Sequence, residues 1–366
     1  MNHRPVLPVL MLICTLTLCP VPGYASDAPP SVPDMPEGAE HPMNREEPSS
    51  VVATPQTLKT AVKQTTGLIS TRISQAVSTA PETGKKFRKP IFGFHEYGTG
   101  LSAGDDEQNI GLGVWGNMSF TNSEDEHFES QSDFDLYNFL TGIDYKITDK
   151  MIAGVSFSYE DMDGPTYYNA GNMAADGFTI SPYFAAMLTN YLSFDVTAGF
   201  SRISIDQDRN RNGLFGPDII SSSLDAERMF IASNLNGYYS VRRWNLSANL
   251  EYLYAEDDQD AFRESNGNEV PSVTIHFGQI SLGSEVSYSF DSVEPYLNLA
   301  YEYDTVYDEN VLGTAYTDYD CDGFVLGGGL RFLLFSVLQG DIQFSSILAR
   351  DEYEEYSLTG NLRFDF

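Results

Sequence analysis

The segment YSLTGNLRFDF, residues 356–366, alternates between two kinds of side chain along its whole length. Counting back from the last residue, every second position is apolar or glycine: Phe366, Phe364, Leu362, Gly360, Leu358 and Tyr356. The positions between them are all polar. Because successive side chains of a β-strand point to opposite faces, this pattern predicts a strand with one apolar and one polar face.

The same period of two extends back to about residue 109 and divides the chain into twelve strand-like segments, each 10 to 19 residues long. They are 110–120, 133–146, 151–160, 174–188, 192–204, 224–241, 244–254, 272–290, 293–304, 322–333, 336–348 and 355–366. The connections between them are alternately tight, as at 147–150, and long and acidic, as at 205–223. This alternation predicts an up-and-down sheet with all its tight turns at one end.

Two fold classes fit an alternating sheet: a soluble β-sandwich and a membrane barrel. Sandwich strands are typically about 5–6 residues long, whereas a strand that crosses a bilayer at a tilt needs about 9–11. Eight charged residues lie on the polar faces of the segments, where they suit a wet lumen better than a dry core: Glu160, Asp195, Glu251, Glu285, Glu302, Arg331, Asp341 and Arg363. We therefore expect an all-β fold, a 12-stranded antiparallel up-and-down transmembrane β-barrel, closed because lipid leaves no sheet edge unpaired.

Composition narrows the range of partners. The chain has 52 acidic and 21 basic residues and a formal net charge of −31. This charge argues against nucleic acid as a partner, because its phosphates would be repelled. No run of 18 apolar residues occurs, so no transmembrane helix is expected.

The segments before the barrel differ in composition. Residues 1–25 combine Arg4, an apolar stretch and small residues before the expected cut after Ala25, which predicts a signal peptide of the Sec type. Residues 26–55 are rich in Pro, Glu and Ser and predict a disordered stub. Residues 56–80 carry apolar side chains at spacings of 4 and 7 and predict an amphipathic helix. A linker over 81–108 and the barrel over 109–366 complete the division.

Several stretches of the barrel resemble one protein family. LTGIDYKITDKMIAGVSFSYEDMDG (140–164), SPYFAAMLTNYLSFDVTAGFSR (181–202), LNGYYSVRRWNLSANLEYLY (235–254) and VEPYLNLAYEYD (293–304) are similar to the translocator domain of autotransporters, which are type V secretion barrels. The resemblance covers roughly 91–366. It implies a barrel in the outer membrane of a Gram-negative bacterium and an upstream helix that threads the pore. Residues 56–80 stand where that helix would lie, and a helix outside the pore is the alternative.

The resemblance also implies partners. The C-terminal pattern of Leu358, Leu362, Phe364 and Phe366 is similar to the signal by which the barrel-assembly machinery recognises such barrels. Lipid and lipopolysaccharide of the outer membrane would surround a monomeric barrel. Only about 30 residues separate the expected signal peptide from the helix, so the sequence predicts a minimal passenger or none. A passive channel for small solutes, and an adhesive or structural surface barrel, are the alternative functions.

The sequence contains no complete motif for a catalytic, cofactor or metal site, and none is predicted. His276 and Ser281 lack the surroundings of an outer-membrane lipase, and the sequence predicts no enzyme. Asp318, Asp320 and Asp322 form the first half of a calcium-type loop, but Gly329 stands where the closing Glu would be. We expect a solvated acidic turn there, and no cofactor.

Overall fold

The computed structural model describes residues 55–77, 112–127, 130–148, 150–213, 216–290, 292–308, 310–311, 314–315, 320–334 and 338–365. All of them belong to one compact unit, Met43–Phe366. The signal peptide expected over 1–25, the stub expected over 26–55 except Pro55, and the linker expected over 81–108 lie outside the described residues.

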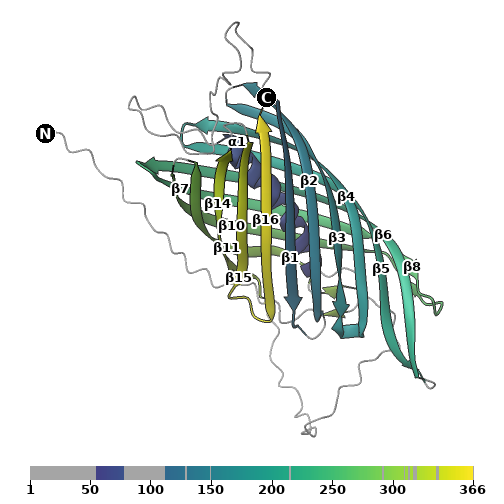
Figure 1. Cartoon of the computed structure of the whole chain (residues 1–366). Helices are drawn as coiled ribbons and strands as arrows, with labels where there is room; N and C mark the ends of the chain where they lie inside the picture. The colour runs from purple at the N-terminus through teal and green to yellow at the C-terminus, as the bar shows by residue number, and fades with distance from the viewer. Residues whose placement is uncertain are drawn as a thin grey trace, which may run out of the picture. The chain divides into compact units, whose positions relative to one another are not determined.

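Within the described part of the chain, twelve long strands form one closed antiparallel barrel (Figure 1). They are β1 (Leu112–Asp125), β2 (Ser132–Thr148), β3 (Met151–Thr166), β4 (Gly171–Thr189), β5 (Leu192–Gly213), β6 (Gly216–Val241), β7 (Trp244–Gln259), β10 (Val273–Tyr288), β11 (Val293–Tyr307), β14 (Asp322–Leu334), β15 (Leu338–Leu348) and β16 (Tyr353–Asp365). Each strand pairs with its neighbours in chain order, and β1 pairs with β16. The 12-stranded up-and-down barrel expected from the alternating pattern is therefore confirmed.

The closing seam between β1 and β16 is long and regular. It runs without a register shift from Gly113↔Asp365 to Asp125↔Tyr353. Through this pairing the last strand loses its free edge, and every long strand has a partner on both sides.

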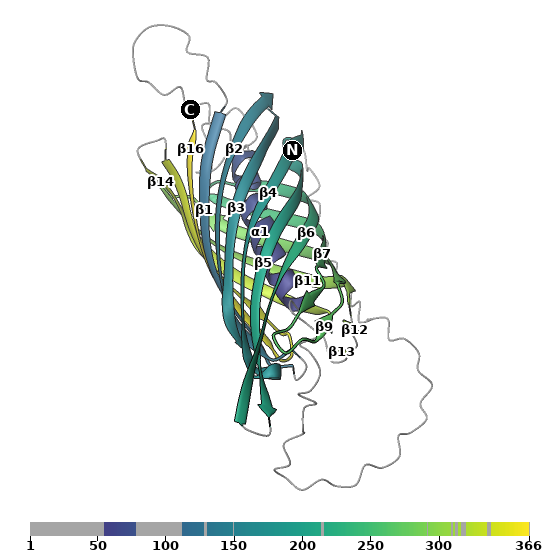
Figure 2. The same ribbon diagram turned by 90° about the vertical axis from the view of Figure 1, so that its right-hand side faces the viewer.

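One end of the barrel carries the long connections between strands and is called the loop end here. Small elements lie in these connections. These are the 3₁₀ turn η1 (Tyr167–Asn169), the pair β8 (Phe262–Arg263) and β9 (Glu269–Val270), and the pair β12 (Asn310–Val311) and β13 (Thr314–Ala315). One expectation was wrong here. The segment 205–223 was expected to be a long loop, but β5 and β6 stay paired up to Gly213↔Gly216 and project beyond their neighbours (Figure 2). Ile203, Ile205 and Leu224 bury their side chains in a cluster shared with β2, β3, β4 and the β7–β10 connection, so inward-facing apolar residues of the neighbouring elements support the base of this hairpin.

The outer face of the barrel is apolar and exposed. Leu358 and Phe178 are 52% and 67% exposed, although both are large and apolar. Similar exposed side chains lie on β2, β7, β10, β11 and β15: Phe139, Leu250, Leu282, Leu297 and Phe344. A continuous apolar exterior of this kind faces lipid rather than water.

The α-helix of the described region, α1 (Pro55–Val77), lies inside the barrel (Figures 1 and 2). It contacts β1 to β7 and β10. This helix is too polar to cross a lipid bilayer by itself, and none in the described residues is long and apolar enough to do so. The contacts with these strands place the inner wall of the barrel around the helix.

Candidate functional site: the contact between α1 and the lumen wall

Helix α1 runs along the lumen with its first residue at the end that carries the long connections. With 23 residues and a rise of 1.5 Å per residue, it is about 34 Å long, which is close to the thickness of a hydrocarbon core. Near its start, the hydroxyl of Thr60 lies 3.0 Å from that of Tyr353, in the first residue of β16. Two turns further on, the carbonyl of Leu68 accepts a hydrogen bond of 3.2 Å from Asn117 of β1.

One face of α1 is buried against apolar wall residues. Leu58 and Val62 pack in a cluster with side chains of β6, β7, β10 and β12: Phe230, Ala232, Leu253, Ala255, Ile275, Phe277 and Val311. Further along the helix, Leu68 and Ile69 pack with Trp115, Leu140, Ile152, Tyr183, Ala185 and Met187. Contacts of this kind stabilise the seated helix through removal of apolar surface from water.

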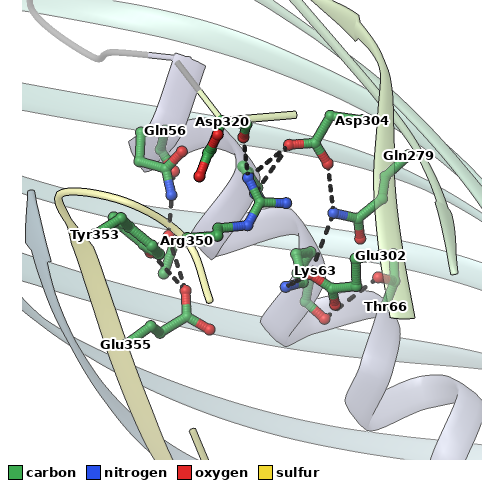
Figure 3. Close-up of polar contacts among 12 residues, drawn as sticks. Gln56, Lys63, Thr66, Gln279, Glu302, Asp304, Asp320, Arg350, Tyr353 and Glu355 are labelled. Carbon is green, nitrogen blue, oxygen red and sulfur yellow. Dashed lines mark hydrogen bonds and ion pairs between the residues drawn. The ribbon is translucent and has the colours of Figure 1, made fainter. Parts of the chain in front are cut away.

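The adjacent face of α1 bears two lysines that pair with carboxylates of β11, and Figure 3 shows the pair formed by Lys63. Lys59 Nζ lies 3.0 Å from Asp304 Oδ2, and both side chains are fully buried, with 0% exposed. Lys63 Nζ lies 2.7 Å from Glu302 Oε2. A buried charge is tolerated only when it is paired and hydrogen-bonded, so these two pairs fix the lysines in place.

Asp304 is the centre of this polar group. Its Oδ2 also accepts a hydrogen bond of 3.0 Å from Arg350, in the β15–β16 connection, and its Oδ1 accepts one of 2.6 Å from Gln279 of β10. Arg350 additionally donates to the backbone carbonyl of Asp320, at 2.7 Å. Asp304 therefore joins the helix to two connections of the loop end (Figure 3).

Polar side chains of the first strands hold the helix from the other side of the seam. Gln64 donates a hydrogen bond of 2.8 Å to the hydroxyl of Thr121, and Asn138 donates one of 2.8 Å to the hydroxyl of Thr65. Both partners come from strands that directly follow the seam, β1 and β2. The helix is thus held by strands from around the barrel.

The comparisons with known proteins point to one family. The family model described as the autotransporter β-domain matches residues 114–339, which is more than half of the chain. The chain belongs to the autotransporter β-domain family. This autotransporter barrel is therefore an outer-membrane protein of the translocator type, and the family assignment does not favour the passive channel or the adhesive barrel.

Solved structures of autotransporter barrels share this fold. The translocator domain of the autotransporter NalP from Neisseria meningitidis matches with a TM-score of 0.65 at 15% identity, and the match covers 86% of this chain and 99% of that one. The β-domain of the Bordetella autotransporter BrkA matches with a TM-score of 0.58 at 16% identity, over 70% of this chain and all of that one. Comparison with curated proteins gave no match.

The charged residues expected on the inner face are placed as follows. Glu160 accepts a hydrogen bond of 2.8 Å from Arg228, which also binds Asp257 of β7. Arg331 forms a two-bond pair with Glu285, at 2.6 Å for each bond, and its guanidinium lies 4.0 Å from the ring centroid of Tyr296. These residues form ion pairs along the lumen wall of the autotransporter barrel, away from the two lysines of α1.

The other expected lumenal residues have different partners. Asp195 accepts hydrogen bonds of 2.9 Å from both Asn234 and Asn236 of β6. Asp341 accepts one of 3.2 Å from Asn361, and Arg363 lies 3.4 Å from Asp144. Glu251 is half-buried on β7, where it pairs in register with Asn234 and Ser281.

The acidic loop considered for a metal is only partly described, because Asp318 lies outside the described residues. The carboxylate of Asp320 accepts a hydrogen bond of 2.9 Å from the backbone of Asp351, and Asp322 begins β14 opposite Tyr303. Within the described ranges, no group of three or more His, Cys, Asp and Glu side chains is placed to hold a metal ion.

The residues of the expected assembly signal lie on the last strand. Leu358 and Leu362 are exposed on the outer face. The backbone of Phe364 pairs with Val114 of β1 and Leu338 of β15, while Phe366 lies outside the described residues.

Sequence reasoning missed the residues that contact α1 most closely. Asp304 and Arg350 belong to the site, yet neither was a candidate, because only the pairing of distant strands brings them to Lys59. The expectation of a wet lumen was also incomplete: three apolar clusters line the inner wall. The sequence carries a signal for these clusters in segments 133–146 and 174–188, where the alternation does not show which face is apolar; Leu136 and Ala175 of these segments face inward.

Proposed function

We propose that this autotransporter barrel carries the segment before α1 to the cell surface and that α1 then stays in the lumen as its seal. The observation that supports this is the buried Lys59–Asp304 pair inside the barrel, together with the position of Pro55 at the loop end. In outer-membrane barrels, long loops face the outside and short turns face the periplasm. A chain that enters α1 at the loop end comes from outside the cell.

The other parts of the chain take roles that fit this proposal. Residues 1–25 direct the chain through the Sec pathway. Residues 26–55 form the exported stub, and residues 81–108 link the periplasmic end of α1 to β1. The barrel-assembly machinery reads the last strand, with Leu358, Leu362, Phe364 and Phe366 as its signal. The mature barrel is monomeric and contacts lipopolysaccharide through its outer face.

Protease treatment of intact cells tests the direction of export. An epitope tag placed within 26–54 is expected to be removed from whole cells. A matched control carries the same tag between Arg242 and Arg243, in the tight turn from β6 to β7, and is expected to resist until the outer membrane is opened. A tag within 26–54 that is protected in whole cells and digested only in opened cells would contradict the proposal.

Planar-bilayer recordings test the seal. The full-length barrel is expected to conduct poorly, and deletion of residues 56–77 is expected to open a stable conductance, because that deletion removes every helix contact described above. An unchanged conductance after the deletion would contradict a sealing role for α1.

A further inference from the structure

The two lysines of α1 and the two carboxylates of β11 are matched in spacing. Lys59 and Lys63 are four residues apart, so they lie on the same helix face about 6 Å apart along the axis. Asp304 and Glu302 are two residues apart and both point into the lumen, separated by about 6.7 Å along the strand. The two lysines are therefore separated along the helix by nearly the same distance as the two carboxylates along the strand.

The geometry points to a ladder of two ion pairs that sets the register at which α1 stops in the lumen. The rungs are Lys59–Asp304 and Lys63–Glu302. This inference rests on the proposed function, because it concerns where the exported chain comes to rest. It goes further in naming the residues that position the seal.

The sequence on either side of the lysines makes the register unique. The positions one turn before Lys59 and one turn after Lys63 are Pro55 and Gly67, and neither carries a charge. A slide of one turn toward the outside would place Lys63 at Asp304 and Gly67 at Glu302. A slide of one turn toward the periplasm would place Pro55 at Asp304. Either slide leaves one buried carboxylate without its lysine, which is strongly unfavourable.

Gln279 and Arg350 hold the carboxylate side of the ladder in place. Gln279 donates to Asp304 Oδ1 at 2.6 Å and to Glu302 Oε2 at 3.3 Å, so it bridges the two rungs. Arg350 binds the same oxygen of Asp304 as Lys59 does. The two acceptors are therefore oriented by wall residues, and the helix supplies the matching pair of cations.

Site-specific cross-linking in the full-length membrane protein tests the register. Thr65 and Asn138 are hydrogen-bonded, so the Thr65→Cys/Asn138→Cys pair reports the observed register. The Ala61→Cys/Asn138→Cys and Ile69→Cys/Asn138→Cys pairs report slides of one turn in either direction. With the native ladder, the first pair is expected to link at least about tenfold more than the other two, a preference that corresponds to about 1.4 kcal/mol.

A neutral ladder removes the charges of both rungs, and Arg350→Met removes the buried guanidinium that Asp304 also binds. In the Lys59→Met/Lys63→Met/Glu302→Gln/Asp304→Asn/Arg350→Met background, the three reporter pairs are expected to link to similar extents. Continued preference for the first pair would overturn the ladder, since apolar packing would then set the register. Loss of all three links would overturn it too, because the ion pairs would then hold α1 in the barrel rather than place it.

A displaced ladder gives a test by gain of signal. A Cβ at Gly67 would meet no atom within 4 Å, so the position has room for a side chain. Lys59→Met/Gly67→Lys puts the two lysines one turn later, and linking is expected to move to Ile69→Cys/Asn138→Cys. The matched control, Lys59→Met/Gly67→Ala, lacks the second lysine and is expected to show no such gain. A displaced ladder that links like the control would overturn the inference. Failure of export itself would appear in the surface tag, not in these links.

Discussion

Gly199 and Phe230 show how closely single residues of the lumen wall are packed. They face each other across β5 and β6, and the Phe230 ring occupies the space that a Cβ on Gly199 would need. We expect Gly199→Ala to destabilise the barrel by about 1–3 kcal/mol, because extra atoms in a packed interior force neighbouring side chains out of position. Urea unfolding in lipid vesicles measures this. Gly360→Ala is the matched control, since its Cβ would meet nothing within 4 Å, and equal stability of the two variants would contradict the expectation.

Buried charges show which residue-level features can be read from the sequence. The strict alternation of a strand places Glu160 on the polar face without any knowledge of its partner. That partner, Arg228, is 68 residues away in the sequence and comes into contact only when β3 and β6 close around the same lumen. A charged residue's face is therefore local information, whereas its ion pair is set by the closure of the barrel.

The Lys59–Asp304 pair gives a prediction at the same scale. We expect Lys59→Met to weaken the seated state of α1 by about 1.5–3 kcal/mol, because Asp304 then loses one of its two buried cations and keeps Arg350. The measurement is the frequency of channel openings in planar bilayers, which is expected to rise. Lys150→Met, at an exposed tight turn, is the control and is expected to leave the openings unchanged. Equal opening frequencies in the two variants would show that Lys59 does not hold the helix.

At the scale of elements, the strands that cross the membrane were predictable and their extensions were not. Membrane-spanning strands alternate cleanly because lipid on one side and the lumen on the other impose a strict period of two. The hairpin tip beyond Ile203 is not held to this period, because it lacks lipid on its outer side. Its polar residues, such as Asp206 and Asp208, are as typical of a loop as of a solvent-exposed strand. The helix was predictable from its apolar spacing, but its packing partners come from strands far away in the sequence.

The connection between β7 and β10 gives a prediction about one loop. Glu264 forms a two-bond ion pair with Arg209 of β5, at 2.8 Å for each bond, and the two side chains are 1% and 4% exposed. Phe262 and Val270 of the same connection are buried in the cluster that includes Ala61 of α1. We expect Glu264→Gln to loosen the connection and to raise trypsin cleavage after Arg263 by at least about tenfold, because a buried pair is broken on one side.

The same connection supplies the matched control. Arg263 and Glu269 also form an ion pair, but these side chains are 67% and 72% exposed. Exposed pairs contribute about 0–1 kcal/mol, so Glu269→Gln is expected to leave the cleavage rate nearly unchanged. If both variants were cleaved at the same rate, the buried pair would not be what holds the connection over α1.

At the scale of the whole molecule, the charge of the chain is distributed unevenly between helix and barrel. Residues 51–90 contain seven basic residues and one acidic residue, whereas residues 91–366 contain 12 basic and 45 acidic residues. The lysines of α1 therefore neutralise part of an acidic wall. Removal of the helix leaves Glu302 and Asp304 facing the open lumen, with Arg350 bound to Asp304 as before.

The selectivity of the open barrel follows from this imbalance. We expect the barrel that lacks residues 56–77 to prefer cations, because carboxylates at a constriction attract cations and repel anions. Reversal potentials measured across a gradient of KCl report the preference. The same deletion combined with Glu302→Gln and Asp304→Asn is expected to reduce it, while Glu354→Gln, on the outer face, is the control that leaves it unchanged. Anion preference in the deleted barrel would mean that the ion pairs of the wall, and not these two carboxylates, determine the field in the lumen.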